Sequence, residues 1–255
     1  MTKKIVITGG LGYIGTELCK IYSGESWRNQ ITVIDNRFVS ERVNQLRNWG
    51  INFVHADIRD SEKIKNFLKK ADTIHHLAGI TDVARTKEET NQDKDNEMND
   101  VAEKGTSIVL HESSKNCKII FPSTHVVFEG KKKMEENIDE DSEKLPVLSY
   151  AIGKDKNEEQ IKKSKKNYII LRLASVYGYS TDTMRLNIMP NLFSRITSQN
   201  GTIKLFAGGK QLKCLVPLID AARCFKFMEE RNDIKFQTFN LSKEKITVEK
   251  VANIC

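Results

Sequence analysis

Short apolar runs alternate with segments of helical periodicity along most of the chain. Six of these runs predict strands, at residues 5–7, 31–34, 51–55, 73–77, 118–121 and 168–171. Apolar positions spaced three and four apart predict helices at 12–22, 41–49, 61–69, about 93–114 and 150–163. Because strands that alternate with helices form parallel sheets covered on both faces, we predict an α/β fold with a Rossmann-type, doubly wound parallel sheet.

The regular alternation ends after residue 171. A loop from Val176 onward, the segments 187–197 and 201–213, a helix-like run at 218–230 and a strand-like run at 236–241 follow. We therefore expect a sheet domain over 1–175 and a small interleaved C-terminal annex over 176–255. Residues 214–242 are expected to return to the main sheet.

Several positions are typical of helix starts or of functional loops. Asp60 or Ser61 precedes one predicted helix, and Thr247 precedes a short helical run. Asp220 is interpreted as an N-cap rather than as a catalytic residue. The connections 79–92 and 123–149 are too long for bare turns, and long loops at the carboxyl ends of parallel strands usually carry function.

A glycine-rich turn directly follows the first apolar run. Gly9, Gly12 and Gly15 are three apart, so the backbone can turn sharply, approach a pyrophosphate and let the next helix pack on the strand. Free N–H groups at the start of that helix attract phosphates. A turn that only needs small residues is the alternative. However, the second apolar run ends in Asp35, twenty positions beyond Gly15, where a dinucleotide site needs an acid for the adenosine ribose.

Tyr150 and Lys154 are four residues apart and therefore lie on one face of a predicted helix. A nearby positive charge favours the phenolate, so we expect Lys154 to lower the pKa of Tyr150 and to make it a usable acid and base. Ser123 and Thr124 end the preceding strand, where a hydroxyl can bind a substrate oxygen beside Tyr150. An ordinary helix with a half-buried tyrosine and a solvated lysine is the alternative.

Composition and charge exclude several classes of protein. The 255 residues are 39% hydrophobic and 29% charged, which allows one sizeable core. No apolar run approaches the ~20 residues that cross a bilayer, and no apolar signal segment is present, so we expect a cytoplasmic protein without a membrane partner. The net charge of +7 is interleaved with acids, which argues against a nucleic-acid partner.

Metal binding is not indicated either. The five cysteines are scattered and lack CxxC spacing, so they predict neither a disulfide framework nor a zinc site. His75 and His76 lie at a strand end without a third ligand at a recognisable spacing. We interpret both histidines as packed or hydrogen-bonded and expect no metal.

Ordered motifs along nearly the whole chain resemble the extended short-chain dehydrogenases/reductases that act on nucleotide sugars. The matching segments are TGGxGYIG at 8–15, the acid at 35, D-[IL]-R at 57–59, HLA at 76–78, S-[ST] at 123–124 and YxxxK at 150–154. Further segments are similar to LR-x-x-x-VYG at 171–178, NLMP at 187–190, QTR at 211–213 and yNiG near 239–241.

This resemblance implies a tightly held NAD in the domain over 1–175 and a nucleotide-sugar substrate at the annex. It assigns catalysis to Tyr150 as acid and base, to Lys154 as its tuner and a contact of the nicotinamide ribose, and to Thr124 as the group that polarises the reacting oxygen. The implied cofactor-binding residues are Gly9, Gly12, Tyr13, Ile14, Gly15, Asp35, Asn36, Asp57, Ile58, Leu77, Ala78, Gly79, Tyr150 and Lys154. The implied substrate-binding residues are Ser123, Thr124, Asn187 and Lys213. Asp57 can instead cap the turn that follows it.

Departures from the family pattern restrict the reactions that the chain is expected to catalyse. Where the 4,6-dehydratases carry an acid after the Ser/Thr pair, this chain has His125, and the glutamate of the decarboxylating relatives is missing. Elimination of water needs an extra acid and base, so the departure argues for epimerisation or simple reduction. Lys213 stands where an arginine usually grips a phosphate bidentately, which predicts looser phosphate binding.

We therefore interpret the chain as an NAD-dependent nucleotide-sugar epimerase, most like a UDP-hexose 4-epimerase. An NAD(P)-dependent reductase or dehydrogenase of a nucleotide keto-sugar and a non-catalytic NAD-binding module are the alternatives. The family commonly dimerises through the helices that correspond to 93–114 and 150–163, so we expect a homodimer. Relatives usually continue beyond the position of Cys255, so we also expect NAD affinity typical of the fold but weak nucleotide-sugar affinity.

Overall fold

A seven-stranded parallel sheet forms the centre of the computed structural model, which describes residues 2–25, 28–81, 91–131, 135, 137–181 and 183–255. Its strands are β1 (Lys4–Thr8), β2 (Gln30–Asp35), β3 (Asn52–His55), β4 (Thr73–His76), β5 (Lys118–Thr124), β6 (Tyr168–Leu173) and β9 (Gln237–Leu241). Their spatial order is β3-β2-β1-β4-β5-β6-β9, and every neighbouring pair is parallel. The predicted α/β class and doubly wound sheet are confirmed.

The order of the strands reverses beside β1. The chain builds outward from β1 through β2 to β3, and β4 then pairs with β1 on its other side. In open α/β sheets, ligands bind in the crevice at this switch point, outside the carboxyl ends of the strands. Of the two long loops predicted at that edge, 79–92 and 123–149, residues 82–90, 132–134 and 136 lie outside the described residues.

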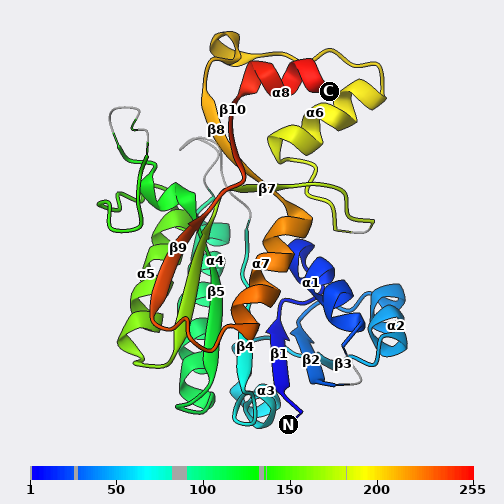
Figure 1. Cartoon of the computed structure of the whole chain (residues 1–255), viewed down its shortest axis with the longest axis vertical. Coiled ribbons are helices and arrows are strands. Elements are labelled where there is room, and N and C mark those ends of the chain that lie inside the picture. Colours follow the sequence, from blue (N-terminus) through cyan, green and yellow to red (C-terminus); the bar gives the residue numbers. More distant parts are fainter. Residues whose placement is uncertain (1, 26–27, 82–90, 132–134, 136, 182) are drawn as a thin grey trace.

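Helices cover both faces of the sheet (Figure 1). One face carries α1 (Tyr13–Ser23), α2 (Ser40–Asn48) and α7 (Leu218–Glu230), whose apolar residues join one core cluster with β1 and β6. The other face carries α3 (Ser61–Leu68), α4 (Gln92–Glu112) and α5 (Ser149–Lys163), whose apolar residues form a second cluster. Burial on both faces explains why the strands read as continuous apolar runs.

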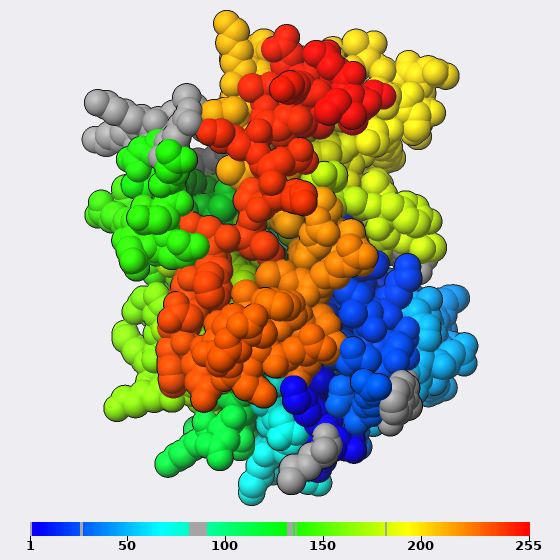
Figure 2. All heavy atoms as spheres, in the orientation of Figure 1, coloured from blue at the N-terminus to red at the C-terminus, as the bar shows by residue number. Residues whose placement is uncertain are grey.

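A small annex lies beyond the carboxyl ends of the strands, at the top of the view in Figure 1, and its atoms occupy the upper part of Figure 2. It contains a three-stranded sheet of β7 (Ser175–Tyr177), β8 (Leu212–Pro217) and β10 (Glu244–Thr247), with α6 (Met189–Ser198), η3 (Phe206–Gly209) and α8 (Val248–Ile254). After β6 the chain passes into the small sheet and forms β7 and β8. It then returns through α7 to the large sheet, where it forms β9, and goes back to the small sheet as β10. The predicted loop from Val176 onward is wrong at its start, because residues 175–177 pair with β8.

Three residues were predicted to be helix N-caps, and the structure shows the N-cap of each helix concerned. The side chain of Asp60 accepts a hydrogen bond from the N–H of Lys63, and Thr247 likewise caps α8, so both predictions are confirmed. The prediction that Asp220 is an N-cap is wrong, because Pro217 is the N-cap of α7. Asp220 lies in the first turn, where its carboxylate faces Arg223 at 3.7 Å.

In the described part of the chain, none of the helices combines the length and the apolar character that a membrane crossing requires.

Candidate active site

The glycine turn joins three elements at very short range. Gly9 has a φ of +71°, and a Cβ there would lie 2.7 Å from the backbone of Ala78, which follows β4. Gly12 is the N-cap of α1, and a Cβ at Gly15 would collide with the carbonyl oxygen of Gly9. A side chain at Gly9 or Gly15 would therefore push the turn, α1 and the end of β4 apart. The close approach leaves the N–H groups at the start of α1 open to an anion.

A cavity of about 460 Å³ opens beside this turn, at the carboxyl edge of β1, β2, β3 and β4. The predicted residues that line it are Gly9, Gly12, Tyr13, Asp35, Asn36, Asp57, Ile58, Leu77, Ala78 and Gly79. Ile14 and Gly15 lie behind them in α1. Thus residues from four separate strand ends, spread over 70 positions of sequence, share one cleft.

Asp35 sits where β2 reaches this cleft and is only 5% exposed. One carboxylate oxygen accepts the N–H of Leu11 at 2.9 Å, which ties the acid to the glycine turn. The other accepts the N–H of Arg37 at 3.0 Å and faces the Arg37 Nε at 3.4 Å. Arg37 also lines the cleft, so an anchored acid and a half-exposed cation stand together where β2 reaches it.

Asp57 supports a second wall of the cleft. Its carboxylate accepts hydrogen bonds from the backbone N–H and the guanidinium of Arg59 at 2.8 to 3.0 Å. Hydrogen bonds from Arg59 lower the pKa of Asp57, against the opposing effect of burial. Asp57 therefore braces its own turn, and because it also lines the cleft, a contact with the cofactor stays a prediction.

These features fit a dinucleotide. The turn offers a cradle that a Cβ would fill, the start of α1 supplies N–H donors for a pyrophosphate, and Asp35 supplies a buried carboxylate one strand away. The chemistry of these described residues therefore fits NAD.

Tyr150, Lys154 and Thr124 lie together at the end of β5 and the start of α5. The Lys154 Nζ donates a hydrogen bond to the carbonyl oxygen of Pro122 at 2.7 Å, and it lies 5.9 Å from the centre of the Tyr150 ring. A hydrogen bond from Thr124 acts on the Tyr150 hydroxyl. The predicted catalytic residues thus meet at the carboxyl edge of the sheet.

The ionisation of this pair differs from the prediction. Burial raises the pKa of Tyr150, although the charge of Arg185 and the hydrogen bond of Thr124 oppose it. Burial also lowers the pKa of Lys154 to about 8, although the charge of Glu158 opposes it. The pKa of Tyr150 is therefore raised, against the predicted direction. The Lys154 side chain is buried, whereas Tyr150 is half-buried.

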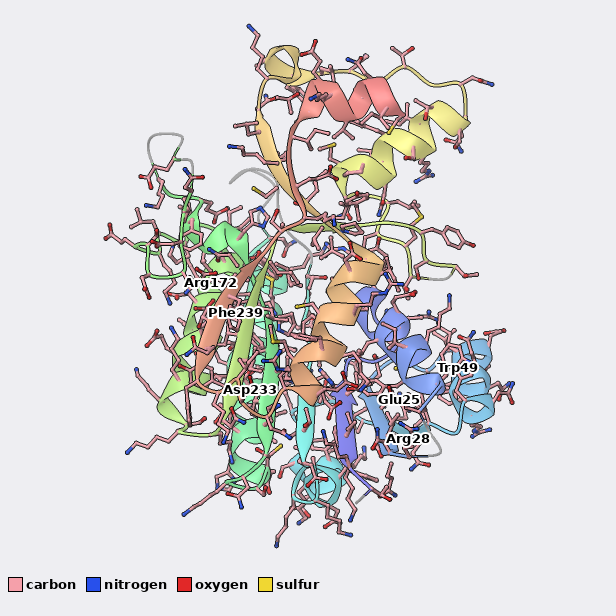
Figure 3. The ribbon with its side chains drawn as sticks, viewed as in Figure 1. Glu25, Arg28, Trp49, Arg172, Asp233 and Phe239 are labelled. Atoms are coloured by element: carbon pink, nitrogen blue, oxygen red, sulfur yellow. The ribbon has the colours of Figure 1, made fainter. Side chains whose placement is uncertain are left out.

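The hydroxyl group of Ser123 donates its hydrogen bond to another side chain of the protein. Its Oγ donates to the carboxylate of Glu158, which is fully buried and also binds the guanidinium of Arg172 at 2.9 and 3.0 Å. Burial would raise the pKa of Glu158, but hydrogen bonds from Arg172 and Ser123 lower it overall. Figure 3 labels Arg172, which belongs to β6 and pairs with Asn240 of β9 in the sheet. A substrate contact of Ser123 would have to use the lone pairs of its oxygen.

The two predicted substrate residues of the annex are not in the cleft. Asn187 and Lys213 are both exposed, Asn187 in the loop before α6 and Lys213 on β8. Asn191, which sequence reasoning missed, is 3% exposed, and its amide nitrogen donates to the Tyr13 hydroxyl at 3.2 Å. No sequence pattern marked Asn191, which lies four positions beyond Asn187.

A segment of the annex forms one side of the cleft. Thr183, Met184 and Arg185 line it, and the Arg185 guanidinium donates to the carbonyl oxygen of Thr81 at 2.8 Å. The amide of Asn191 holds the Arg185 carbonyl at 3.0 Å. These residues lie in a polar stretch without hydrophobic periodicity, so the sequence carries no local signal for their position.

The strand-end histidines are buried and hydrogen-bonded, as interpreted. His75 faces the Tyr22 hydroxyl at 2.8 Å, and His76 lies between the hydroxyls of Thr8 and Thr106 at 2.9 and 3.0 Å. Burial lowers the pKa of each histidine to about 3, which keeps both rings neutral. Among the described residues, no group of three or more His, Cys, Asp and Glu side chains is arranged to hold a metal ion.

Comparison with known proteins extends these observations. Residues 5–242 match the model of the family described as NAD dependent epimerase/dehydratase family. The chain is 23% identical over 261 residues to a UDP-glucose 4-epimerase of Mycoplasma genitalium, a match that covers 93% of this chain and 76% of that protein. It is 26% identical over 256 residues to a dTDP-D-glucose 4,6-dehydratase of Dictyostelium discoideum, which covers 91% of this chain but only 56% of that protein.

Among solved structures, the chain is similar to a UDP-glucose 4-epimerase of Thermotoga maritima that was crystallised with UDP-glucose. The TM-score is 0.83 at 21% sequence identity, and the match covers 98% of this chain and 80% of that one. This likeness shows the fold, including the annex.

Proposed function

We propose, because this chain belongs to the NAD-dependent epimerase/dehydratase family, that it is a nucleotide-sugar epimerase, most like a UDP-hexose 4-epimerase. The observation that carries the proposal is the meeting of Thr124, Tyr150 and Lys154 at the sheet edge that also carries the dinucleotide cleft. Acid–base chemistry next to a redox cofactor is what reversible oxidation of a sugar hydroxyl requires.

We propose that the adenosine half of NAD binds along this cleft with its ribose at Asp35. Asp35 would accept hydrogen bonds from the adenosine ribose, and Gly9 and Gly12 would face the pyrophosphate at the start of α1. Asn36, Asp57 and Ile58 would line the adenine end, and Leu77, Ala78 and Gly79 the path toward Tyr150. NAD held by these residues would supply the reversible hydride transfer that oxidation and re-reduction of a sugar carbon require.

The protein's own part in the reaction is proton transfer. As the phenolate, Tyr150 would take the proton of the hydroxyl that is oxidised, and as the phenol it would return this proton when the keto group is reduced from the other face. Thr124 holds the same oxygen by a hydrogen bond, and Lys154 fixes the end of β5 against α5 through the Pro122 carbonyl. The three side chains thereby keep one oxygen in place through both halves of the reaction.

Nucleotide-sugar binding is proposed for the annex over 176–255, with the dinucleotide in the domain over 1–175. Lys213 and Asn187 are proposed contacts of the substrate, and their exposure leaves both side chains free to approach it. Ser123 would contribute only as an acceptor, because its proton is donated to Glu158.

His125 favours epimerisation over dehydration. It follows Thr124, at the position where dehydratases of this family carry an acid, and its Nδ1 lies 2.9 Å from the carbonyl oxygen of Leu173. Because that carbonyl can only accept, Nδ1 carries the proton. Burial lowers the pKa of His125, so the ring is neutral and does not replace a carboxylic acid as a proton donor.

The test is an assay of the purified chain with NAD and UDP-hexoses, in which product sugars are separated by chromatography and the absorbance of reduced cofactor is followed. An epimerase changes the configuration at C4 without net consumption of NAD. Stoichiometric oxidation or reduction of the cofactor would instead support the reductase or dehydrogenase. Cofactor binding without turnover of any nucleotide sugar would support the non-catalytic module.

A further inference from the structure

Asn191 joins the annex to the glycine turn of the sheet domain. It lies in α6 and is 3% exposed, and its amide nitrogen donates to the Tyr13 hydroxyl at 3.2 Å and to the Arg185 carbonyl at 3.0 Å. Its Oδ1 accepts the N–H of Gly178 at 3.0 Å. Both polar atoms of this buried side chain are therefore bound to partners outside α6.

Tyr13 completes this junction from the side of the sheet domain. It is the first residue of α1, directly after the N-cap Gly12, and its hydroxyl donates to the Gly178 carbonyl while it accepts the hydrogen bond from Asn191. Gly178 is thus held at its N–H by the annex helix and at its carbonyl by the helix that begins at the glycine turn. A shift of α6 relative to α1 would break these bonds.

Arg185 connects the same amide to a second element of the sheet domain. Its guanidinium donates to the Thr81 carbonyl, beyond the carboxyl end of β4, at 2.8 Å. Arg185 and Thr81 both line the cleft, as does Tyr13. The annex segment 183–185, which forms one wall of the cleft, is therefore tied to α1 through Asn191 and to the loop after β4 through Arg185.

A wall fixed in this way favours cofactor binding. If the wall is already ordered, the cofactor gains its contacts without a cost for ordering it, whereas a loosened wall lowers the affinity by that cost. Asn191 is the informative residue for this effect, because its amide is neutral and its loss changes no charge at the cleft.

We propose that Asn191 is a positioning residue for NAD, which holds the annex wall of the cleft in place through Tyr13 on one side and Arg185 on the other. Asn191 is a described residue that does not itself line the cleft, so it acts through these two neighbours. The inference rests on the proposed place of NAD in the cleft. It does not depend on the epimerase reaction, because it concerns cofactor binding alone.

The test measures NAD affinity by calorimetric titration and NADH release by the change in fluorescence after preloaded protein is mixed with excess NAD. We expect Asn191→Ala to weaken NAD binding about tenfold and to speed NADH release by a similar factor. Arg185→Met, which loses the Thr81 bond, should also weaken NAD binding. The double variant should weaken it by less than the product of the two factors, because both changes remove the same support.

Ser198→Ala is the matched control, because Ser198 is exposed on the same helix and its hydroxyl donates to the Arg195 carbonyl within that helix. It should leave NAD affinity unchanged. Hydrogen exchange without NAD separates a loosened wall from a weakened fold. In Asn191→Ala, peptides that contain Gly178 should exchange faster, while peptides of β5 should exchange as in the unmutated protein.

Unchanged NAD affinity and NADH release in folded Asn191→Ala would overturn the inference. Equally faster exchange in β5 and at Gly178 would also overturn it, because Asn191 would then only support the fold. If Asn191→Ala does not fold by circular dichroism, Arg185→Met decides by the same two measurements, and unchanged NAD binding in that variant overturns the inference.

Asp35→Asn separates this inference from the proposed place of NAD. If Asp35→Asn weakens NAD binding and Asn191→Ala does not, the cleft remains the cofactor site and only the role of Asn191 is removed. If neither variant weakens it, the proposed place of NAD is wrong as well. None of these measurements uses turnover, so a failure of the proposed epimerase activity leaves their outcome unaffected.

Discussion

Lys154 and Pro122 are joined by a hydrogen bond from the Nζ to the carbonyl oxygen at 2.7 Å. This bond fixes the face of α5 that carries Tyr150 and Lys154 against the end of β5, where Thr124 is the last residue of the strand. The ammonium is thus a structural clamp as well as a charge.

The first prediction concerns catalysis. Tyr150→Phe removes the exchangeable proton, and Lys154→Met removes the clamp, so each should lower turnover by at least ~10²-fold. NAD should still bind to Tyr150→Phe, as measured by calorimetric titration. Tyr168→Phe and Lys163→Met, at the far ends of β6 and α5, are the controls and should retain turnover. Near-normal turnover in Tyr150→Phe would remove the mechanism.

The second prediction concerns cofactor choice. The buried carboxylate of Asp35 repels a 2′-phosphate and accepts ribose hydroxyls, so NAD should bind at least about tenfold more tightly than NADP. Arg37 is the opposing influence, since its guanidinium lines the same end of the cleft. Arg37→Gln should therefore increase the preference for NAD over NADP. Equal calorimetric affinities for the two cofactors in the unmutated protein would contradict the proposed role of Asp35.

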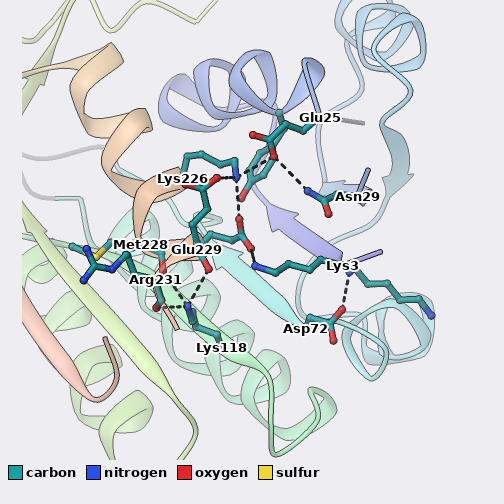
Figure 4. Close-up of polar contacts among 12 residues, drawn as sticks. Lys3, Glu25, Asn29, Asp72, Lys118, Lys226, Met228, Glu229 and Arg231 are labelled. Atoms are coloured by element: carbon teal, nitrogen blue, oxygen red, sulfur yellow. Dashed lines mark hydrogen bonds and ion pairs between the residues drawn. The ribbon is translucent and has the colours of Figure 1, made fainter. Parts of the chain in front are cut away.

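The third prediction concerns a charge cluster at the opposite edge of the sheet (Figure 4). Lys226 pairs with Glu229 at 3.1 Å and with Glu230 at 2.7 Å, but Glu229 is 1% exposed and Glu230 55%. Glu229 also binds Lys3 at 2.7 Å. Breaking a buried pair costs about 3 kcal/mol and an exposed one less than about 1 kcal/mol. Glu229→Gln should thus destabilise the fold far more than Glu230→Gln in urea unfolding.

The same pair predicts a pH dependence. Burial would raise the pKa of Glu229, but hydrogen bonds from Lys3 and Lys226 lower it overall. Its contribution to stability is therefore present above the carboxyl pKa of the unfolded chain, about 4.3, and is lost as the pH falls through the lower folded value. Glu229→Gln should make unfolding free energy less dependent on pH in that acidic range. An equal pH slope in both proteins would show that Glu229 is not the titrating group.

The fourth prediction concerns assembly. We propose a homodimer through the outer faces of α4 and α5, which pack on one another within the chain through a hydrogen bond from Ser149 to Asp95 at 2.9 Å. Light scattering at micromolar concentration should then give twice the 29.1 kDa of one chain. Ile152→Glu, on the partly exposed face of α5, should give monomers, whereas Phe206→Glu on the annex should not. A monomeric parent would contradict the proposal.

The sequence by itself determined the elements whose signal is local. The glycine turn, the acid at the end of β2 and the Tyr150 to Lys154 spacing each depend on neighbours within one turn or one strand, and the structure places all of them at one edge of a parallel sheet. Backbone geometry makes such short-range patterns readable, because three-residue and four-residue spacings have fixed directions in helices and turns. The boundaries of α7 were predicted to the residue for the same reason.

Only the tertiary structure decided which distant groups surround these elements. Arg185 meets Thr81 across 104 positions, and Asn191 meets Tyr13 across 178, in stretches that have no periodic pattern. The short strand β7 exists because β8 pairs with it, and the raised pKa of Tyr150 reflects burial that no spacing reveals. Local patterns fix where a side chain points along its own helix or strand, whereas desolvation and charge depend on what the rest of the chain brings against it.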